Sequence, residues 1–230
     1  MAGLFNFFPD FAKNGPGISK DAPPKTGLAM LIDIYRREWW CIIKLNLLFL
    51  LFCLPIFTIG PALAAMSKIT LTMVQDKNVD LWYDFKNAFR ENFSQSLIAG
   101  LILAGAGLAV AAASWLYLFY LPPGILVYLL LAINLTVILI LLLASFYIFP
   151  QIVSVSLPLR TVMRNAVLLG LSCLKHSLPA LLFIVAITLI PVLFPSVFPL
   201  VLLLYFSNIS VFASFAVWPD IKKHIALKAQ

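Results

Sequence analysis

The chain has 230 residues, of which 63% are hydrophobic and only 11% are charged, and its mean hydropathy is +1.03. Soluble domains carry about 25% charged residues, so this composition excludes most soluble enzymes, nucleic-acid-binding proteins and disordered proteins. The net charge of +7 is the surplus expected when basic loops stay on the cytoplasmic side of a membrane. We therefore predict an integral membrane protein whose partner is the lipid bilayer, not nucleic acid.

The amino-terminal segment, residues 1–38, is predicted to be cytoplasmic. Its apolar start is interrupted at Asn6, Pro9 and Asp10 and is followed by no small-residue cleavage site, so it is not a secretory signal and is expected to stay in the mature protein. Residues 15–25, GPGISKDAPPK, have three prolines and no apolar periodicity. Such a segment is either a solvated tail or a strap that another surface orders.

The first apolar stretch, residues 45–67, contains no charged residue and is either one span or a hairpin that turns at residues 58–61. Basic residues precede and follow it, and more lie between the later apolar stretches and at the carboxyl end. Only the hairpin places all of these basic segments on one side of the membrane. We therefore predict spans over residues 39–57 and 61–75, with a five-span arrangement as the alternative.

An amphipathic helix is expected between the first two hairpins. Aromatic residues recur there at helical spacing, while charged residues occupy the other face, as in a helix that lies in the membrane interface. The aromatic residues of this predicted interfacial helix are Trp82, Phe85, Phe89 and Phe93.

The second hairpin is predicted from 68 residues without charge, 92–159. One span needs about 20 residues, and Pro122, Pro123 and Gly124 provide a turn between spans over residues 97–120 and 125–149. The first of these spans contains small residues three or four apart, which allow helices to approach closely. They are Ala99, Gly100, Ala104, Gly107 and Ala111.

The last predicted hairpin, with spans over residues 177–191 and 198–218, turns at the proline-rich segment 191–199. The predicted fold is therefore all-α: a polytopic transmembrane bundle of about six spans in three hairpins over residues 39–218. Residues 219–230 form a predicted cytoplasmic tail, and both termini are expected in the cytoplasm.

The predicted spans hold little catalytic chemistry. All nine acidic residues lie outside them, which argues against a proton-coupled carrier or pump and against hydrolysis by paired carboxylates. Cys173 and His176 lack the further ligands of a zinc site, and the chain has no phosphate-binding loop of the type GxxxxGK[ST]. We expect no metal, no cofactor and no enzymatic activity.

Five polar residues in or near the spans are candidate contacts for a substrate or partner: Lys44, Asn46, Lys68, Asn134 and Asn208. Lys44 is close enough to a span end to extend its ammonium group to the interface. Lys68 could do the same or face a cavity. Asn134 and Asn208 lie near span centres, where they either connect helices by hydrogen bonds or form a polar lining.

Several of these residues belong to segments that resemble a known family. The segments 43–66 and 84–97 resemble the YesL-like family of small bacterial membrane proteins, a domain of unknown function, and 15–25 resembles the amino-terminal signature of one of its branches. The matching residues include Asn46, Leu54, Pro55, the run Thr58–Ala62, Ala65, Phe85, Phe89, Asn92 and Phe93.

The resemblance implies a role beside carbohydrate uptake, because members of that family are typically encoded near sugar ABC importers. It also favours the strap interpretation for Gly15, Lys20 and Lys25. Our leading hypothesis is a non-enzymatic accessory subunit or regulator, in the bacterial cytoplasmic membrane, that docks on the permease subunits of such an importer. The alternative is a self-sufficient carrier or channel for a small solute, which requires the intramembrane polar residues to line one cavity.

Overall fold

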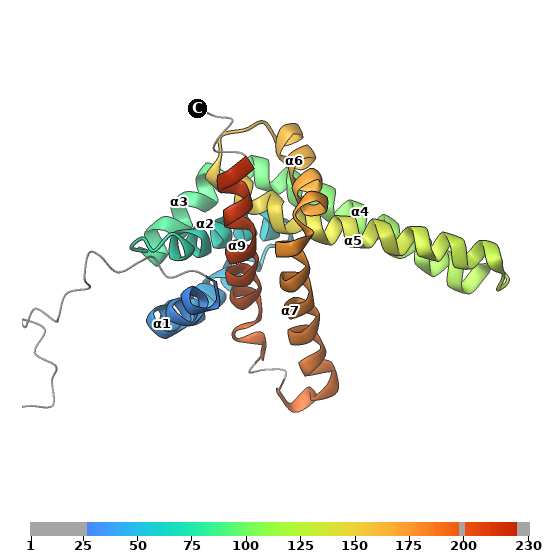
Figure 1. Ribbon diagram of the computed structural model, residues 1–230, viewed down its shortest axis with the longest axis horizontal. Coiled ribbons are helices and arrows are strands. Elements are labelled where there is room, and N and C mark those ends of the chain that lie inside the picture. Colours follow the sequence, from blue (N-terminus) through green and yellow to red (C-terminus); the bar gives the residue numbers. More distant parts are fainter. Residues whose placement is uncertain (1–26, 198–200, 225–230) are drawn as a thin grey trace, which may run out of the picture.

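The computed structural model describes residues 27–197 and 201–224, and within these ranges all regular secondary structure is helical. The prediction of an all-α fold is confirmed. The elements, shown in Figure 1, are α1 (Leu28–Phe52), η1 (Ile56–Thr58), α2 (Ile59–Val74), α3 (Leu81–Glu91), α4 (Phe93–Tyr120), α5 (Ile125–Ser154), α6 (Leu159–Ser172), α7 (Leu174–Leu193), η2 (Pro195–Val197) and α9 (Tyr205–His224).

Six of these helices form three antiparallel pairs, one at each predicted hairpin. In the α1–α2 pair, the Arg37 guanidinium forms an ion pair with Asp76 just after α2. In the α7–α9 pair, the rings of Phe183 and Phe212 stack with centroids 3.5 Å apart. The α4–α5 pair turns at residues 121–124, as the two prolines and the glycine predict.

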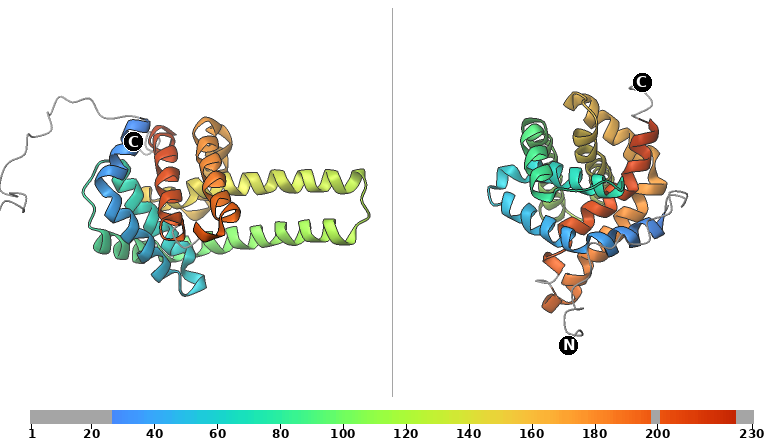
Figure 2. Two further views of the ribbon diagram at one scale, coloured as in Figure 1. Left: turned by 90° about the horizontal axis from the view of Figure 1, so that it is seen from below. Right: turned by 90° about the vertical axis from the view of Figure 1, so that its left-hand side faces the viewer.

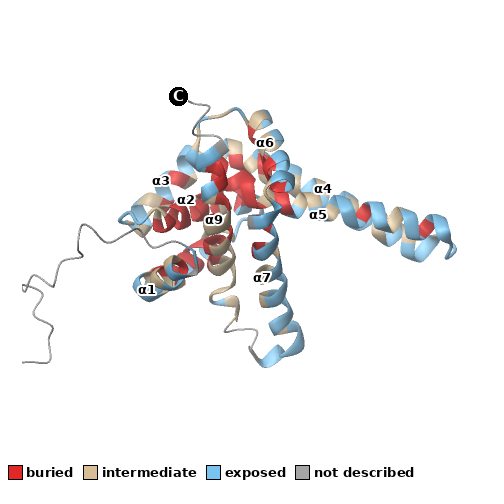
Figure 3. Ribbon diagram, viewed as in Figure 1, coloured by how far each residue is buried: buried red, intermediate tan, exposed pale blue. Residues whose placement is uncertain are grey.

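The α4–α5 hairpin projects from the rest of the protein, at a large angle to the α7–α9 pair (Figures 1 and 2). We call the remaining helices, together with the bases of α4 and α5, the head. Burial is concentrated in the head, whereas most residues along the hairpin are exposed (Figure 3). The three pairs therefore do not form one parallel bundle.

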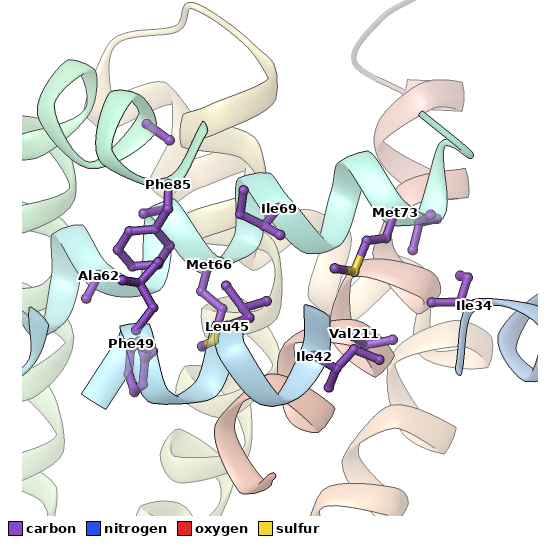
Figure 4. Packing of buried hydrophobic residues seen from close by; sticks show 14 of the residues in the cluster. Ile34, Ile42, Leu45, Phe49, Ala62, Met66, Ile69, Met73, Phe85 and Val211 are labelled. Atoms are coloured by element: carbon purple, nitrogen blue, oxygen red, sulfur yellow. The ribbon is translucent and has the colours of Figure 1, made fainter. Parts of the chain in front are cut away.

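Helix α2 is the centre of the head. Twelve of its 16 residues are buried, because α1, α3, α9 and the bases of α4 and α5 all pack against it. Figure 4 shows Met66 of α2 beside Leu45 of α1, and Ile42 of α1 beside Val211 of α9, all within one buried cluster. A central helix covered on this many sides contributes mainly packing to the fold.

Helix α3 packs against the closed end of the α1–α2 hairpin. The ring of Phe52, at the end of α1, makes edge-on contacts with Phe85 and Phe89 of α3, with centroids 5.2 and 5.0 Å apart. The exposed Lys86 and Arg90 therefore lie on a helix beside this turn. The contact between α3 and this turn was not predicted from the sequence.

The turn of the first hairpin also lies earlier in the chain than predicted. It covers residues 53–58, and Gly60 already belongs to α2. The Thr58 hydroxyl donates to the carbonyls of Phe52 and Pro55, each at 2.5 Å, and so stabilises the turn. Pro61 lies in the first turn of α2, where its missing N–H leaves no helical hydrogen bond unmade.

The predicted count of six spans is not confirmed. By length and composition, three described segments can cross a membrane: Ile56–Val74, Phe93–Tyr120 and Ile125–Ser154. The pair α6 and α7 would add a fourth only across a 90° bend. Helix α1 carries four charged residues from Arg36 to Lys44, and α9 runs beyond the predicted boundary at 218 into Asp220, Lys222 and Lys223. Long apolar helices of this kind are consistent with a membrane protein.

Candidate functional site

The five predicted contact residues do not converge on one site. Lys44 and Lys68 are exposed, Asn46 and Asn134 are buried, and Asn208 is half-buried. Each asparagine is engaged in a hydrogen bond with another helix or with the segment before α9.

Asn46 of α1 forms hydrogen bonds with the beginning of α9 and the segment before it. Its side chain is fully buried, and its amide nitrogen donates to the carbonyl of Leu202 at 2.9 Å. Its amide oxygen accepts from the backbone N–H groups of Phe206 and Ser207, each at 3.1 Å. The first N–H groups of a helix have no partner within the helix, so Asn46 acts as a cap supplied by another helix.

Asn208 makes a second contact between α1 and α9. Its amide oxygen accepts from the Tyr35 hydroxyl at 2.5 Å. Burial raises the pKa of Tyr35 above its usual value, so the phenol stays protonated further into the alkaline range. Asn46 and Asn208 thus hold the first and third hairpins together.

Asn134 connects the two helices of the projecting hairpin. Its amide nitrogen donates to the Val110 carbonyl at 3.0 Å and to the Ser114 hydroxyl at 2.5 Å, both on α4. An interhelical bond is one of the two roles expected for an asparagine near the centre of an apolar helix. Its polar groups are therefore used within the hairpin.

A buried polar cluster that the sequence analysis missed lies where α5, α7 and α9 meet. The hydroxyl of Tyr147 donates to Asp220 at 2.9 Å and lies 2.8 Å from the hydroxyl of Ser177. Asp220 is only 4% exposed, although the sequence placed it in the cytoplasmic tail. Burial and the Asp220 carboxylate raise the pKa of the neighbouring Cys173 thiol, which keeps that thiol protonated.

A second polar cluster joins α2 to α9. The Thr70 hydroxyl lies 3.0 Å from that of Ser210 and 2.7 Å from that of Ser214. Ser207, Ser210 and Ser214 are all buried, and their spacing of three and four residues places them on one face of α9. That spacing is visible in the sequence and could have identified the buried face of this helix.

The predicted interfacial helix turns its aromatic face into the protein. Phe85 is fully buried and Phe89 packs partly buried beside it, whereas Trp82 is 57% exposed. Phe93 contacts Phe89 at the start of α4, with centroids 5.5 Å apart. The predicted strap, with Gly15, Lys20 and Lys25, lies outside the described residues.

Two apolar grooves adjoin at Ser145. The first, of about 300 Å³, lies between α4 and α5. The second, of about 150 Å³, lies between α2, α5 and α9. None of the five predicted polar residues lines either groove. The first groove is lined by Leu103, Gly107, Val110, Ala111, Ile138, Leu141, Leu142 and Ser145.

Metal-binding chemistry is not apparent in residues 27–197 and 201–224, where no three His, Cys, Asp or Glu side chains are grouped to hold an ion.

The two grooves offer apolar surface and small residues, which suit a hydrocarbon chain or an apolar helix.

Part of the chain is similar to a known protein family. The model of the family described as "Protein of unknown function, DUF624" matches residues 42–113, from the middle of α1 to the second half of α4. The matched part of the chain is therefore similar to this family, and it includes Asn46 and the α1–α3 contacts. No curated protein and no solved structure matches the chain significantly.

Proposed function

We propose that this chain is a non-enzymatic accessory protein of the bacterial cytoplasmic membrane that docks on the permease subunits of a carbohydrate ABC importer. Its termini are proposed to face the cytoplasm, because basic residues flank the apolar segments. The role in carbohydrate uptake is supported by the resemblance of segments 43–66 and 84–97 to the YesL-like family.

The observation that carries the docking proposal is the groove on the projecting hairpin. Gly107 and Ala111 leave its α4 side open, and a Cβ placed on Gly107 would meet no atom within 4 Å. Transmembrane helices associate through small residues of this kind, because the backbones can then approach closely. A transmembrane helix of the permease is the occupant that the proposal assigns to the groove.

The carrier alternative finds less support. It needs Lys44, Lys68, Asn134 and Asn208 to line one cavity. Instead, Asn134 is bonded within the hairpin and Asn208 is bonded to Tyr35 of the head. Lys44 and Lys68 are on exposed faces of two different helices.

A matched pair of glycines tests the docking proposal. Gly105 and Gly107 are both on α4, and a Cβ on either would meet no atom within 4 Å, but only Gly107 lines the groove. We expect Gly107→Leu to reduce co-purification of the importer permease after mild detergent extraction, and Gly105→Leu to leave it unchanged. Equal capture by both variants, or no capture by the parent protein, would contradict the proposal.

The strap is the second proposed contact. Deletion of residues 12–25 should leave membrane insertion intact, since the apolar helices carry that information, and should weaken sugar uptake or permease capture. A deletion strain that imports its sugar and retains its partners as well as the parent strain would favour a solvated tail.

A further inference from the structure

The free part of the α4–α5 hairpin has the length of a bilayer core. On the α5 side, the head ends at Leu143, whose Cβ would lie 3.2 Å from a Cβ on Gly170 of α6. Beyond it, most residues of 103–120 in α4 and 125–142 in α5 are exposed (Figure 3). Eighteen helical residues extend about 27 Å, close to the hydrocarbon thickness of about 30 Å.

Charge and aromatic residues mark the two ends of this hairpin. No charged residue lies between Glu91 and Arg160, so the free part is uncharged throughout. Near the tip, Trp115, Tyr120 and Tyr128 are exposed, as expected at a membrane–water interface. At the base, α6 packs along α5 and carries Arg160 and Arg164, which suit the phosphates of a lipid surface.

Helix α7 lies on the side of the head from which the hairpin projects (Figures 1 and 2), after the 90° bend that follows α6. One face of α7 packs on α9 through Phe183. The other face is apolar and exposed, and no charged residue follows Lys175 within the helix. Its exposed residues include Leu178, Leu182, Val185, Leu189, Val192 and Leu193.

Helix α2 is apolar enough to span but is not placed to do so. Its apolar window is 67% buried inside the protein, against 11% for α4 and for α5. Helix α3 packs alongside it and carries the exposed Lys86, Arg90 and Glu91. A transmembrane α2 would bring these charges to membrane depth, where each is costly.

We propose that, of the described helices, only α4 and α5 cross the bilayer, and that α7 lies along the leaflet surface at their base with its exposed apolar face among the lipids. In this arrangement the hairpin enters the bilayer through the leaflet on which α7 lies. The turn after α7 then stays on the same side of the membrane as the head. This inference does not depend on the proposed function.

Accessibility of single cysteines distinguishes this arrangement from a bundle in which the α7–α9 pair also crosses. Cys41, Cys53 and Cys173 are replaced by alanine, and one cysteine is introduced by Gly124→Cys at the hairpin tip, Ser196→Cys after α7, or Lys86→Cys on α3. Each is labelled with a membrane-impermeant maleimide in intact cells and in inverted membrane vesicles.

We expect Ser196→Cys and Lys86→Cys to be labelled from one side of the membrane and Gly124→Cys from the other. Labelling of Ser196→Cys from the same side as Gly124→Cys would overturn the proposal, and so would labelling of all three from one side. Pro123→Cys and Phe194→Cys provide second probes of the two turns. An unchanged size-exclusion profile in detergent confirms that a variant is folded.

Discussion

Gly60 of α2 and Gly100 of α4 bring two helix backbones into direct contact. A Cβ placed on Gly100 would lie 3.0 Å from the Cα of Gly60, and a Cβ placed on Gly60 would overlap the carbonyl oxygen of Ser96. Neither glycine has a positive φ. Both positions therefore require glycine for close approach between the head and the base of the hairpin, and not for turn geometry.

Replacement of Gly60 by alanine should destabilise the protein, because the new methyl group meets backbone, which cannot rotate away. Overpacking of this kind costs about 1–3 kcal/mol, and Gly60→Leu should cost more. Thermal unfolding in detergent measures the effect. The matched control is Gly105→Ala, which meets open space; it should leave the midpoint unchanged or raise it, since alanine is the better helix former. Equal midpoints for the two alanine variants would show that α2 and α4 do not touch here.

Asn46→Leu should destabilise the contact between α1 and α9. The change leaves the N–H groups of Phe206 and Ser207 buried without their acceptor, and each unsatisfied group costs about 1–3 kcal/mol. Denaturant unfolding in detergent checks this prediction. Asn87→Leu is the control, because Asn87 is exposed and bonds only along its own helix to Glu91. If Asn46→Leu were as stable as Asn87→Leu, Asn46 would not act as a cap for α9.

The positions of the helices followed from local signals in the sequence. The absence of charge over residues 92–159 predicted the second hairpin, and Pro122, Pro123 and Gly124 predicted its turn. An interhelical bond was one of the two roles considered for Asn134 from its place in an apolar stretch, and the structure shows that bond. In each case the cause lies within the segment itself, so one sequence was sufficient.

The directions of the hairpins could not be predicted in this way. The spacing of Phe85 and Phe89 predicts that one face of α3 is shielded from solvent. It does not show whether lipid or protein covers that face. In the structure, Phe52 covers that face. Asp220 was missed for a related reason, because its burial depends on Tyr147 and Ser177, which are far from it in the sequence.

Tyr147→Phe should destabilise the junction of α5, α7 and α9. It removes the hydroxyl that donates to Asp220, and a hydrogen bond to a charged group contributes about 1.5–3 kcal/mol. Tyr128→Phe is the matched control, since Tyr128 is 66% exposed on the same helix. Thermal unfolding of both variants in one detergent should show a lower midpoint for Tyr147→Phe alone. Identical midpoints would mean that the buried bond contributes nothing measurable.

The Asn134–Ser114 bond should be measurable as a coupling between α4 and α5. The Ser114 hydroxyl donates to the Val110 carbonyl and accepts from the Asn134 amide, so removal of either side chain breaks the bond. In a double-mutant cycle with Asn134→Val and Ser114→Ala, we expect a coupling free energy of about 0.6–2 kcal/mol, the range found for polar pairs inside membranes.

Thr136 provides the control cycle, because it bonds only to its own helix, at the carbonyl of Ala132. The pair Asn134→Val and Thr136→Val should show no coupling beyond additivity. Unfolding in detergent with increasing denaturant provides all the free energies from one method. If the Asn134–Ser114 coupling were no larger than that of the control pair, the bond to Ser114 would contribute nothing measurable, and the bond from the Asn134 amide to the Val110 carbonyl would be the one that connects the two helices.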